Sequence, residues 1–288
     1  MQSLSGLSHL YQLEPLKTER LAAKFIDKLM DDNRFVGLDD TFVNFPWSVM
    51  INHGIKMVIP PVTNGFVVCQ HIYFREMIPQ WKEIGVKVVF TPHCEEHFID
   101  GLEIRPFPHW MANPGSPHNR RDIYDVSFIG ASLTHWTRRY IMGLEPTFWT
   151  ENNIRFFGLN TGKWHFEQPE ETKRNHFDLF RSVMRSSNFA LCPRGTGPGT
   201  IRFWEALSFG TIPIVIANGW KLPAAIYEWD DVIVRIPESE NEIIKLPEII
   251  HAIKNVPDRQ AKCLALAAQF QHEGFITPIL QYLSDKLK

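Results

Sequence analysis

Two patterns of apolar and polar positions alternate along the second half of the chain, one typical of buried strands and one typical of amphipathic helices. Four of five continuous apolar runs of strand length are followed by an amphipathic stretch with a helical period. This alternation predicts a mainly parallel sheet with helices on both faces, which binds ligands outside the carboxyl ends of its strands. The expected strands cover 125–131, 153–159, 188–193, 212–217 and 232–237, and the expected helices cover 135–144, 171–186, 200–210 and 240–253.

The first 118 residues repeat this pattern less regularly and predict a second α/β unit. Residues 108–122 are rich in Pro, Gly, Asn and Ser and have no periodicity, so they are the predicted linker. We therefore expect domains at 1–118 and 119–265, and a C-terminal helix within 266–288 that packs back on the first domain. In the first domain an amphipathic helix is expected over 19–30, and strands are expected over 56–61, 65–70, 86–90 and 102–107.

The composition is that of a globular protein with nearly balanced charge. Hydrophobic residues make up 44% of the 288 and the net charge is −2, so cores are expected and a nucleic-acid partner is not. The sequence has no basic-then-apolar leader and no apolar run of membrane-spanning length, so we expect a soluble chain with no membrane span. Cys69, Cys94, Cys192 and Cys263 are scattered singly, which favours reduced thiols and a cytosol-like compartment.

A glycine-rich loop lies between an apolar strand and a short helix in "NFALCPRGTGPGTIRFWEALSFG". Gly195, Gly197 and Gly199 allow the backbone to approach a ligand closely, and Thr200 is a plausible N-cap for a helix that ends at Gly210. Exposed N–H groups and the positive end of the helix dipole favour a phosphate at this place. The spacing fits neither a dinucleotide-binding fingerprint nor a P-loop, so the sequence predicts an anion site of another kind.

Arg202 and Glu205 lie three residues apart on this helix and therefore share a face. The arginine is suited to neutralise a diphosphate, and the carboxylate is suited to accept hydrogen bonds from two ribose hydroxyls. A surface ion pair of small energetic value explains the same spacing. The spacing alone leaves both interpretations open.

Two longer stretches carry a resemblance to a known family. "SSNFALCPRGTGPGTIRFWEALSFGTIPIVIANGWKLPAAIYEWDDVIVRIPES" resembles the nucleotide-sugar-binding segment of the exostosin-type glycosyltransferases (family 47). That segment has a Ser-x-Phe-x-Leu-Cys-Pro-Arg-Gly strand and loop, an Arg-x-x-Glu-Ala helix, a Gly-x-Ile-Pro-Val-Ile strand and a Leu-Pro loop. "DIYDVSFIGASLTHWTRRYIM" resembles the family's preceding strand, glycine loop and Arg-bearing helix. The likeness covers residues 120–240 well and the N-terminal half poorly.

The resemblance implies an α/β fold of the GT-B type, in which two Rossmann-like domains face each other across a cleft. Animal and plant members of the family usually carry an N-terminal transmembrane helix, which this sequence lacks, so we expect either an excised catalytic part or a compact, soluble relative, and the small N-terminal half favours the second. The C-terminal domain would hold a nucleoside diphosphate sugar, and residues 1–118 would form the acceptor side. Carried over by position, Glu205 would bind the ribose, while Arg202, Gly199 and Thr200 would hold the diphosphate. Further candidates for the donor pocket are Ile201, Arg194, Gly195, Gly130, Ser132 and Arg138.

The chain departs from the family pattern at two places. Position 200 is Thr where Ser is common, and the Leu-Pro of "LPAAIYEW" lacks the usual following Phe, so the shape of the pocket and the identity of the donor stay open. The chain also contains no D-x-D or D-x-H pair of the kind that holds a sugar diphosphate through a divalent metal. We therefore expect neither a metal requirement nor another cofactor, with arginine and the helix dipole stabilising the leaving group.

The stretch "FTPHCEEHFID" supports two different chemistries. His93, Glu96 and His97 have the H-x-x-E-H spacing that places two imidazoles one turn apart on a helix, as in a zinc hydrolase. In a GT-B enzyme the same loop would face the acceptor, where one side chain takes the proton of the attacking hydroxyl. The candidate bases are Glu95 and His93, followed by His71 and Glu96.

The function predicted from these residues is a metal-independent inverting glycosyltransferase that moves a sugar from a UDP-sugar to a glycan hydroxyl. The family's donors include UDP-glucuronate, UDP-GlcNAc, UDP-galactose and UDP-xylose. UDP-xylose is preferred because "NGWKLPAA" offers no obvious extra cation for a uronate carboxylate, although Arg and Lys elsewhere in the chain could supply one. A non-catalytic nucleotide-sugar or glycan-binding protein is one alternative, and a zinc hydrolase that uses residues 93–97 is another. The sequence makes no prediction of the oligomeric state.

Overall fold

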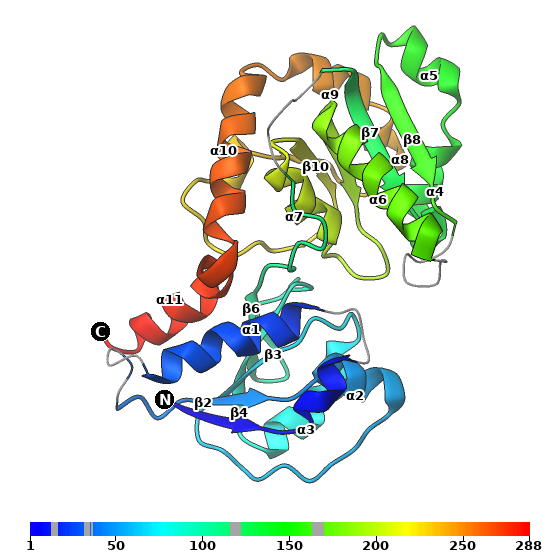
Figure 1. Ribbon diagram of the computed structural model, residues 1–288. Helices are drawn as coiled ribbons and strands as arrows, with labels where there is room; N and C mark the ends of the chain where they lie inside the picture. The colour runs from blue at the N-terminus through cyan, green and yellow to red at the C-terminus, as the bar shows by residue number, and fades with distance from the viewer. Residues whose placement is uncertain (13–16, 32–34, 36, 116–121, 163–169) are drawn as a thin grey trace. The chain divides into compact units, whose positions relative to one another are not determined.

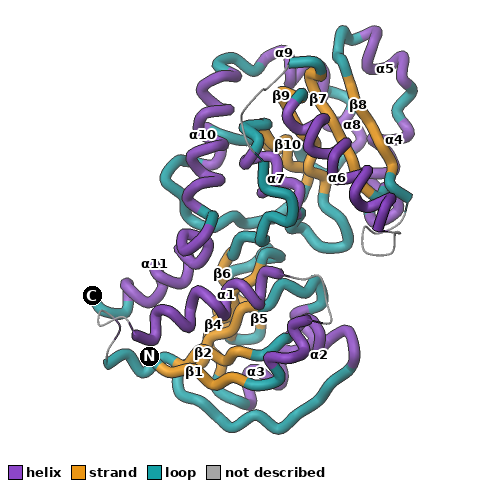
Figure 2. Tube along the Cα trace, viewed as in Figure 1, coloured by secondary structure: helices purple, strands orange, loops and turns teal. Residues whose placement is uncertain are grey.

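The chain folds into two compact units, each built around its own sheet (Figures 1 and 2). Unit 1 comprises residues 1–110, 219–224 and 270–288, and unit 2 comprises 111–218 and 225–269. The predicted boundary between residues 118 and 119 lies outside the described residues. The computed structural model describes residues 1–12, 17–31, 35, 37–115, 122–162 and 170–288.

Unit 2 contains a parallel sheet of five strands in the order β11-β10-β9-β7-β8. The chain runs outward from β7 to β8 and then returns to place β9 on the other side of β7. Loops that follow β7 and β9 therefore diverge, which is the arrangement that opens a ligand-binding crevice in parallel sheets. The strands are β7 (Tyr124–Gly130), β8 (Phe156–Asn160), β9 (Ser187–Pro193), β10 (Ile212–Ile216) and β11 (Val234–Arg235).

Helices cover the sheet of unit 2 because the strands are apolar on both faces. The five residues of β10 and all but one of the seven in β9 are buried, so neither strand shows the alternation of a half-exposed sheet. α6 packs on β7 and β9, and α7 packs between the sheet and α10. The helices are α4 (Trp136–Gly143), α5 (Pro146–Glu151), α6 (Glu170–Arg185), α7 (Ile201–Ser208), α8 (Glu240–Ile243), α9 (Leu246–Ala252) and α10 (Val256–Gln269).

Unit 1 contains a sheet of six strands in the order β1-β2-β3-β4-β6-β5, parallel except for the β5–β6 pair. Two mainly parallel sheets of this kind confirm the predicted α/β class with two Rossmann-like domains. The strands are β1 (Gln2–Ser5), β2 (Thr41–Asn44), β3 (Gly65–Val68), β4 (Val86–Thr91), β5 (Phe98–Ile99) and β6 (Leu102–Pro106), and the helices are α1 (Lys17–Asp27), α2 (Trp47–His53), α3 (Ile78–Glu83) and α11 (Thr277–Asp285).

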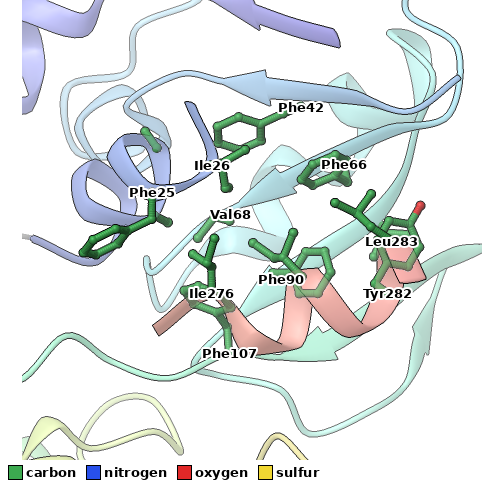
Figure 3. Packing of buried hydrophobic residues seen from close by; sticks show 14 of the residues in the cluster. Phe25, Ile26, Phe42, Phe66, Val68, Phe90, Phe107, Ile276, Tyr282 and Leu283 are labelled. Atoms are coloured by element: carbon green, nitrogen blue, oxygen red, sulfur yellow. The ribbon is translucent and has the colours of Figure 1, made fainter. Parts of the chain in front are cut away.

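The sheet of unit 1 has a separate apolar core on each face. On one face, side chains of α1 and α11 converge on phenylalanines of β2, β3 and β4, as Figure 3 shows for Ile26, Leu283, Phe42, Phe66 and Phe90. The ring of Phe90 meets those of Phe66 and Tyr282 edge to face, whereas the rings of Phe42 and Phe66 are stacked. On the other face, α2 and α3 bury Trp47 and Trp81, whose rings also meet at right angles. Residues 270–288, the greater part of the predicted C-terminal segment, thereby contribute to the core of unit 1.

The structure corrects several predicted elements. The strand expected over 56–61 is wrong: this stretch is irregular, Val58 is 95% exposed, and Pro60 and Pro61 have no N–H to donate to a ladder. β1, β2, α2 and α3 are short and went unpredicted. Among the described residues, no helix combines the length and the apolar composition needed to cross a membrane.

Gly85, in the turn from α3 to β4, is the glycine whose replacement we expect to damage the fold of unit 1. Its φ is +88°, and a Cβ there would lie 2.1 Å from the carbonyl oxygen of Val62. Gly85→Ala is therefore expected to lower the free energy of unfolding by more than about 2 kcal/mol, since backbone strain and a steric clash add. Gly101→Ala is the matched control, with φ +84° but nothing within 4 Å of the new Cβ. Equal losses for the two variants in urea unfolding would contradict this assignment.

Candidate functional site

The candidate donor site lies at the carboxyl edge of the unit 2 sheet, where the loops after β7 and β9 diverge. Arg138, from α4, bridges these two loops with its guanidinium group. Its Nε donates to the carbonyl oxygen of Arg194 at 2.9 Å, its Nη2 to that of Pro193 at 3.0 Å, and its Nη1 to that of Ala131 at 3.4 Å. Arg138 is thus a structural cation fixed in the crevice that the strand order creates.

Arg202 places a second guanidinium group beside the first. Its Cζ lies 5.7 Å from the ring centre of Phe128 and 5.4 Å from that of Phe180, so aromatic faces hold it in place. Its buried Nε has no hydrogen-bond partner in the part of the chain that the structure describes. Burial, and then the neighbouring Arg202, lowers the pKa of Arg138 to about 9, and burial also lowers the pKa of Arg202. Two desolvated cations together favour an anionic ligand.

Gly130 and Gly195 have no side chain, and this absence makes room for the two guanidinium groups. A Cβ at Gly130 would lie 2.9 Å from Nη1 of Arg202, and one at Gly195 would lie 3.2 Å from Nη2 of Arg138. The sequence favoured Gly195 for close backbone approach to a ligand, and the family resemblance made Gly130 a candidate for the same pocket. In the structure, the groups that approach them are the two guanidinium groups.

The helix that follows the glycine loop begins as predicted. Thr200 has the extended backbone of an N-cap, but its side chain makes no capping hydrogen bond, so it leaves the first-turn N–H groups to other partners. Gly199 is half-buried and Ile201 is 38% exposed, so Ile201 is not part of the core. Ser132 lies after β7, and its N–H donates to Oδ1 of Asn160, at the end of β8.

Glu238, an acidic residue that the sequence did not reveal, also lies at this edge of the unit 2 sheet. Glu238 follows β11, and its Oε1 accepts hydrogen bonds from the N–H of Asn218 at 2.6 Å and from Nη1 of Arg194 at 3.4 Å. Its own N–H donates to Oδ1 of Asn218 at 3.0 Å. Glu238 therefore orients Arg194, one of the predicted donor residues. The only signal in the sequence was a polar residue directly after the last predicted strand.

Glu205 lies three residues after Arg202 on α7 and is 3% exposed. Its Oε1 accepts hydrogen bonds from the N–H of Asn113 at 2.9 Å and from Nδ2 of Asn113 at 3.2 Å. Asn113, which lies in the predicted linker, is thus hydrogen-bonded to Glu205, the residue predicted to bind the ribose. Burial raises the pKa of Glu205 to about 7, and Arg202 opposes this shift only in part.

We expect Glu205→Gln to change the pH dependence of stability. Because the pKa of Glu205 in the folded protein lies above its ordinary value of 4.5, the folded protein binds more protons than the unfolded chain between pH 4.5 and 7. As the pH rises from 4.5 to 7, the free energy of unfolding of the wild type should therefore fall by about 1–3 kcal/mol relative to that of the variant. Urea unfolding at pH 4.5 and pH 8 measures the difference. A difference that does not depend on pH would contradict the raised pKa.

The candidate acceptor-side residues lie at the carboxyl edge of the unit 1 sheet, but not on a helix. Residues 92–97 form turns after β4, so the helix expected to carry His93 and His97 one turn apart is wrong. In the ranges that the structure describes, no three His, Cys, Asp or Glu side chains gather in a way that could hold a metal ion. The zinc-hydrolase alternative therefore loses the geometry on which it rested.

The two candidate histidines differ in how their ring nitrogens are engaged. Nε2 of His93 lies 3.0 Å from the carbonyl oxygen of Gln70, which only accepts, so Nε2 carries the proton and Nδ1 is the basic nitrogen of the neutral ring. In His71, Nδ1 accepts from the N–H of Tyr73 at 3.1 Å, and Nε2 donates to Oδ1 of Asn52 at 2.7 Å. Both nitrogens of His71 thus serve the local structure.

The two glutamates of this turn are on the surface and share one cation. Nη2 of Arg75 lies 2.9 Å from Glu96 and 3.8 Å from Glu95, and the Glu96 side chain is 59% exposed. Such an exposed pair contributes little to stability. The turn itself is held by the segment after β10, because Nε1 of Trp220 donates to the carbonyl oxygen of Pro92 at 2.8 Å.

A family model described as the exostosin GT47 domain matches residues 66–253, more than half of the chain. Exostosin-1b of Danio rerio is 33% identical over 93 residues, which cover 32% of this chain and 12% of that protein. Exostosin-1 of Mus musculus is 32% identical over 103 residues, 35% of this chain and 13% of that protein. The exostosin-1 homolog of Caenorhabditis elegans is 27% identical over 127 residues, 42% of this chain and 32% of that protein. The chain thus spans a third or less of these relatives.

The solved structures to which this chain is similar share little sequence with it. A crystal structure of TarM has a TM-score of 0.46 and 9% identity, and covers 82% of this chain and 58% of TarM. A crystal structure of AviGT4, a glycosyltransferase involved in avilamycin A biosynthesis, has a TM-score of 0.45 and 11% identity, and covers 92% of this chain and 76% of AviGT4.

Proposed function

Since this chain belongs to the exostosin GT47 domain family, we propose that it is an inverting glycosyltransferase that moves a sugar from a UDP-sugar to a hydroxyl of a glycan. The observation that carries the proposal is the Arg138–Arg202 pair at the carboxyl edge of the unit 2 sheet. Two desolvated guanidinium groups repel each other, and the diphosphate of a nucleotide sugar supplies the charge that relieves this repulsion.

We assign the donor to the residues around α7. Arg202 and the first N–H groups of α7 stabilise the charge that develops on the diphosphate as the C1–O bond breaks. Glu205 binds the ribose hydroxyls, while Arg194 and Ser132 line the same edge. No divalent metal takes part in this assignment, because the guanidinium groups and the helix dipole supply the positive charge.

On the acceptor side we assign the general base to His93. The oxygen of the acceptor hydroxyl attacks C1 from the face opposite the diphosphate, and its proton passes to Nδ1 of His93 as the leaving group departs. This displacement inverts the configuration at C1. Glu95 is the second candidate, because its carboxylate lies two residues away in the same turn.

The alternative is a non-catalytic nucleotide-sugar or glycan-binding protein, which would have the same donor pocket. Turnover of a UDP-sugar distinguishes the transferase from the binding protein. We propose UDP-xylose as the first donor to test, ahead of UDP-glucuronate, UDP-GlcNAc and UDP-galactose.

A donor screen tests the proposed function directly. Purified protein is incubated with each UDP-sugar in EDTA, with and without a panel of glycan acceptors, and UDP release is measured. We expect one donor to release UDP faster in the presence of one acceptor, since transfer needs both substrates. Loss of activity on chelation would contradict the metal-free assignment. UDP binding by calorimetry without release from any donor would favour the binding protein.

A further inference from the structure

A buried carboxylate that the proposed reaction does not use lies at the carboxyl edge of the unit 1 sheet. Glu19, in the first turn of α1, is 3% exposed. Its carboxylate accepts hydrogen bonds from Oγ of Ser48 at 2.6 Å, from the N–H of Ser48 at 3.1 Å and from the N–H of Gln70 at 2.9 Å. These donors come from α2 and from the residues after β3, so one side chain joins three segments that are distant in sequence.

Glu19 and Gln70 are joined by two reciprocal hydrogen bonds. The N–H of Glu19 donates to Oε1 of Gln70 at 3.2 Å, while the N–H of Gln70 donates to Oε1 of Glu19. Two opposed hydrogen bonds fix the main chain of Gln70 more firmly than either bond alone. The carbonyl oxygen of this same residue accepts the Nε2 proton of His93.

The neighbouring residue of α1, Thr18, binds a second segment that contacts the ring of His93. Oγ1 of Thr18 accepts from the N–H of Trp110 at 2.9 Å. The residue before Trp110 is His109, whose ring centre lies 5.2 Å from that of His93, with the rings at 73°. The first turn of α1 therefore fixes two groups that contact the ring of His93.

We propose that Glu19 is a positioning residue for the acceptor-side base, because it fixes the carbonyl of Gln70 that keeps the proton of His93 on Nε2 and leaves Nδ1 as the basic nitrogen. This inference rests on the proposed function, in which His93 takes the acceptor proton. A histidine that acts as a base works best when its other nitrogen is bound to a fixed acceptor, which sets both the tautomer and the ring orientation.

The cost of burying this carboxylate supports a role beyond packing. Burial raises the pKa of Glu19 to about 7, and the hydrogen bonds from Ser48 and Gln70 oppose this shift without cancelling it. Burying a carboxylate is costly unless hydrogen bonds compensate for the lost water, so the donors of Ser48 and Gln70 must be kept in a fixed geometry around Glu19.

The test reads the Nε2 proton of His93 by NMR, through the rate at which it exchanges with water. The variants are Glu19→Ala, Gln70→Ala, which removes only the side-chain half of the reciprocal pair, and Glu19→Gln, which keeps a neutral acceptor. We expect exchange at His93 to rise about tenfold or more in Glu19→Ala, to rise less in Gln70→Ala, and to stay near the wild-type rate in Glu19→Gln. The N–H of Val62, which donates to the carbonyl oxygen of Ile84 at 2.8 Å, is the internal control, since it lies in the same unit but on neither segment that Glu19 binds.

Specific loss of protection at His93 supports the proposal. Unchanged exchange in Glu19→Ala and Gln70→Ala, or an equal rise at the N–H of Val62, overturns it, because the effect would then be absent or merely structural. A faster rate in Glu19→Gln as well overturns positioning by hydrogen bonds. If Glu19→Ala does not fold, the exchange rate of the His93 Nε2 proton in Gln70→Ala alone tests the proposal.

Kinetics separate this inference from the proposed function. In a chain that transfers sugar, Glu19→Ala should lower kcat by about 10- to 100-fold with little change in the KM for the donor, since a displaced base slows the chemical step. If the wild type transfers no sugar, the proposed function fails, and the exchange rates still show whether Glu19 positions His93.

Discussion

Arg202→Ala is expected to lower kcat for sugar transfer by about 10²- to 10³-fold while the protein stays folded. The guanidinium group of Arg202 is held by the rings of Phe128 and Phe180, and its buried Nε has no hydrogen-bond partner among the described residues. A charged donor kept in this way is ready to bind a charge that grows during the reaction. Because that charge develops on the leaving diphosphate, affinity for the UDP-sugar should fall less than kcat.

Two further variants serve as controls for Arg202→Ala. Gly130→Ala should reproduce much of the kinetic loss without removing the arginine, because the new Cβ would displace Nη1 of Arg202. Arg138→Ala should instead lower the melting temperature, because Arg138 donates to three main-chain carbonyl oxygens that would lose their partner. Steady-state kinetics and thermal melts of the three proteins measure these effects. Full turnover in Arg202→Ala would place the stabilisation of the diphosphate elsewhere.

Unit 2 was predictable because its local signals agree with its tertiary structure. β9 and β10 are apolar along almost their whole length, as strands covered on both faces must be, and the glycine loop and α7 follow at the predicted positions. Each predicted strand of this unit is present, with ends that differ by a few residues. The candidate donor residues could be named from the sequence because they lie on or just before the loops and helices that directly follow the strands.

Unit 1 was harder to predict because its elements are short and its contacts are distant in sequence. β1 and β2 have four residues each, too few to show a period, and they pair across nearly forty residues. The stretch 56–61 looked like a strand from its apolar residues, whereas its prolines forbid a ladder.

The interactions that complete both sites join residues that no local pattern connects. Glu205 and Asn113 are 92 positions apart, and Glu19 and Gln70 are 51 apart. Only the fold brings such pairs together, so the sequence could name Glu205 as a site residue but not the linker residue that it binds. Glu19 was counted as part of an amphipathic helix, because nothing near it in the sequence marks it as buried and bonded.

His93→Gln is expected to lower kcat by about 10²- to 10⁴-fold with the KM for the UDP-sugar nearly unchanged. His93 is 4% exposed and carries its proton on Nε2, so Nδ1 is the nitrogen that accepts a proton in the proposed reaction. Glutamine has a similar size and retains a donor for the carbonyl of Gln70, but it has no basic nitrogen. The variant should therefore fold and bind donor yet fail in the chemical step.

His71→Gln and Glu95→Gln decide whether that loss is specific to His93. Both ring nitrogens of His71 are hydrogen-bonded within the turn that follows β3, so its replacement should affect stability more than kcat. Glu95 lies near Arg75 in a partly exposed ion pair, so its replacement should change kcat little. Transfer rates of the three variants with saturating donor and acceptor measure the difference. If Glu95→Gln loses activity and His93→Gln keeps it, the base is the carboxylate, and the hydrogen bond from His93 to Gln70 is structural.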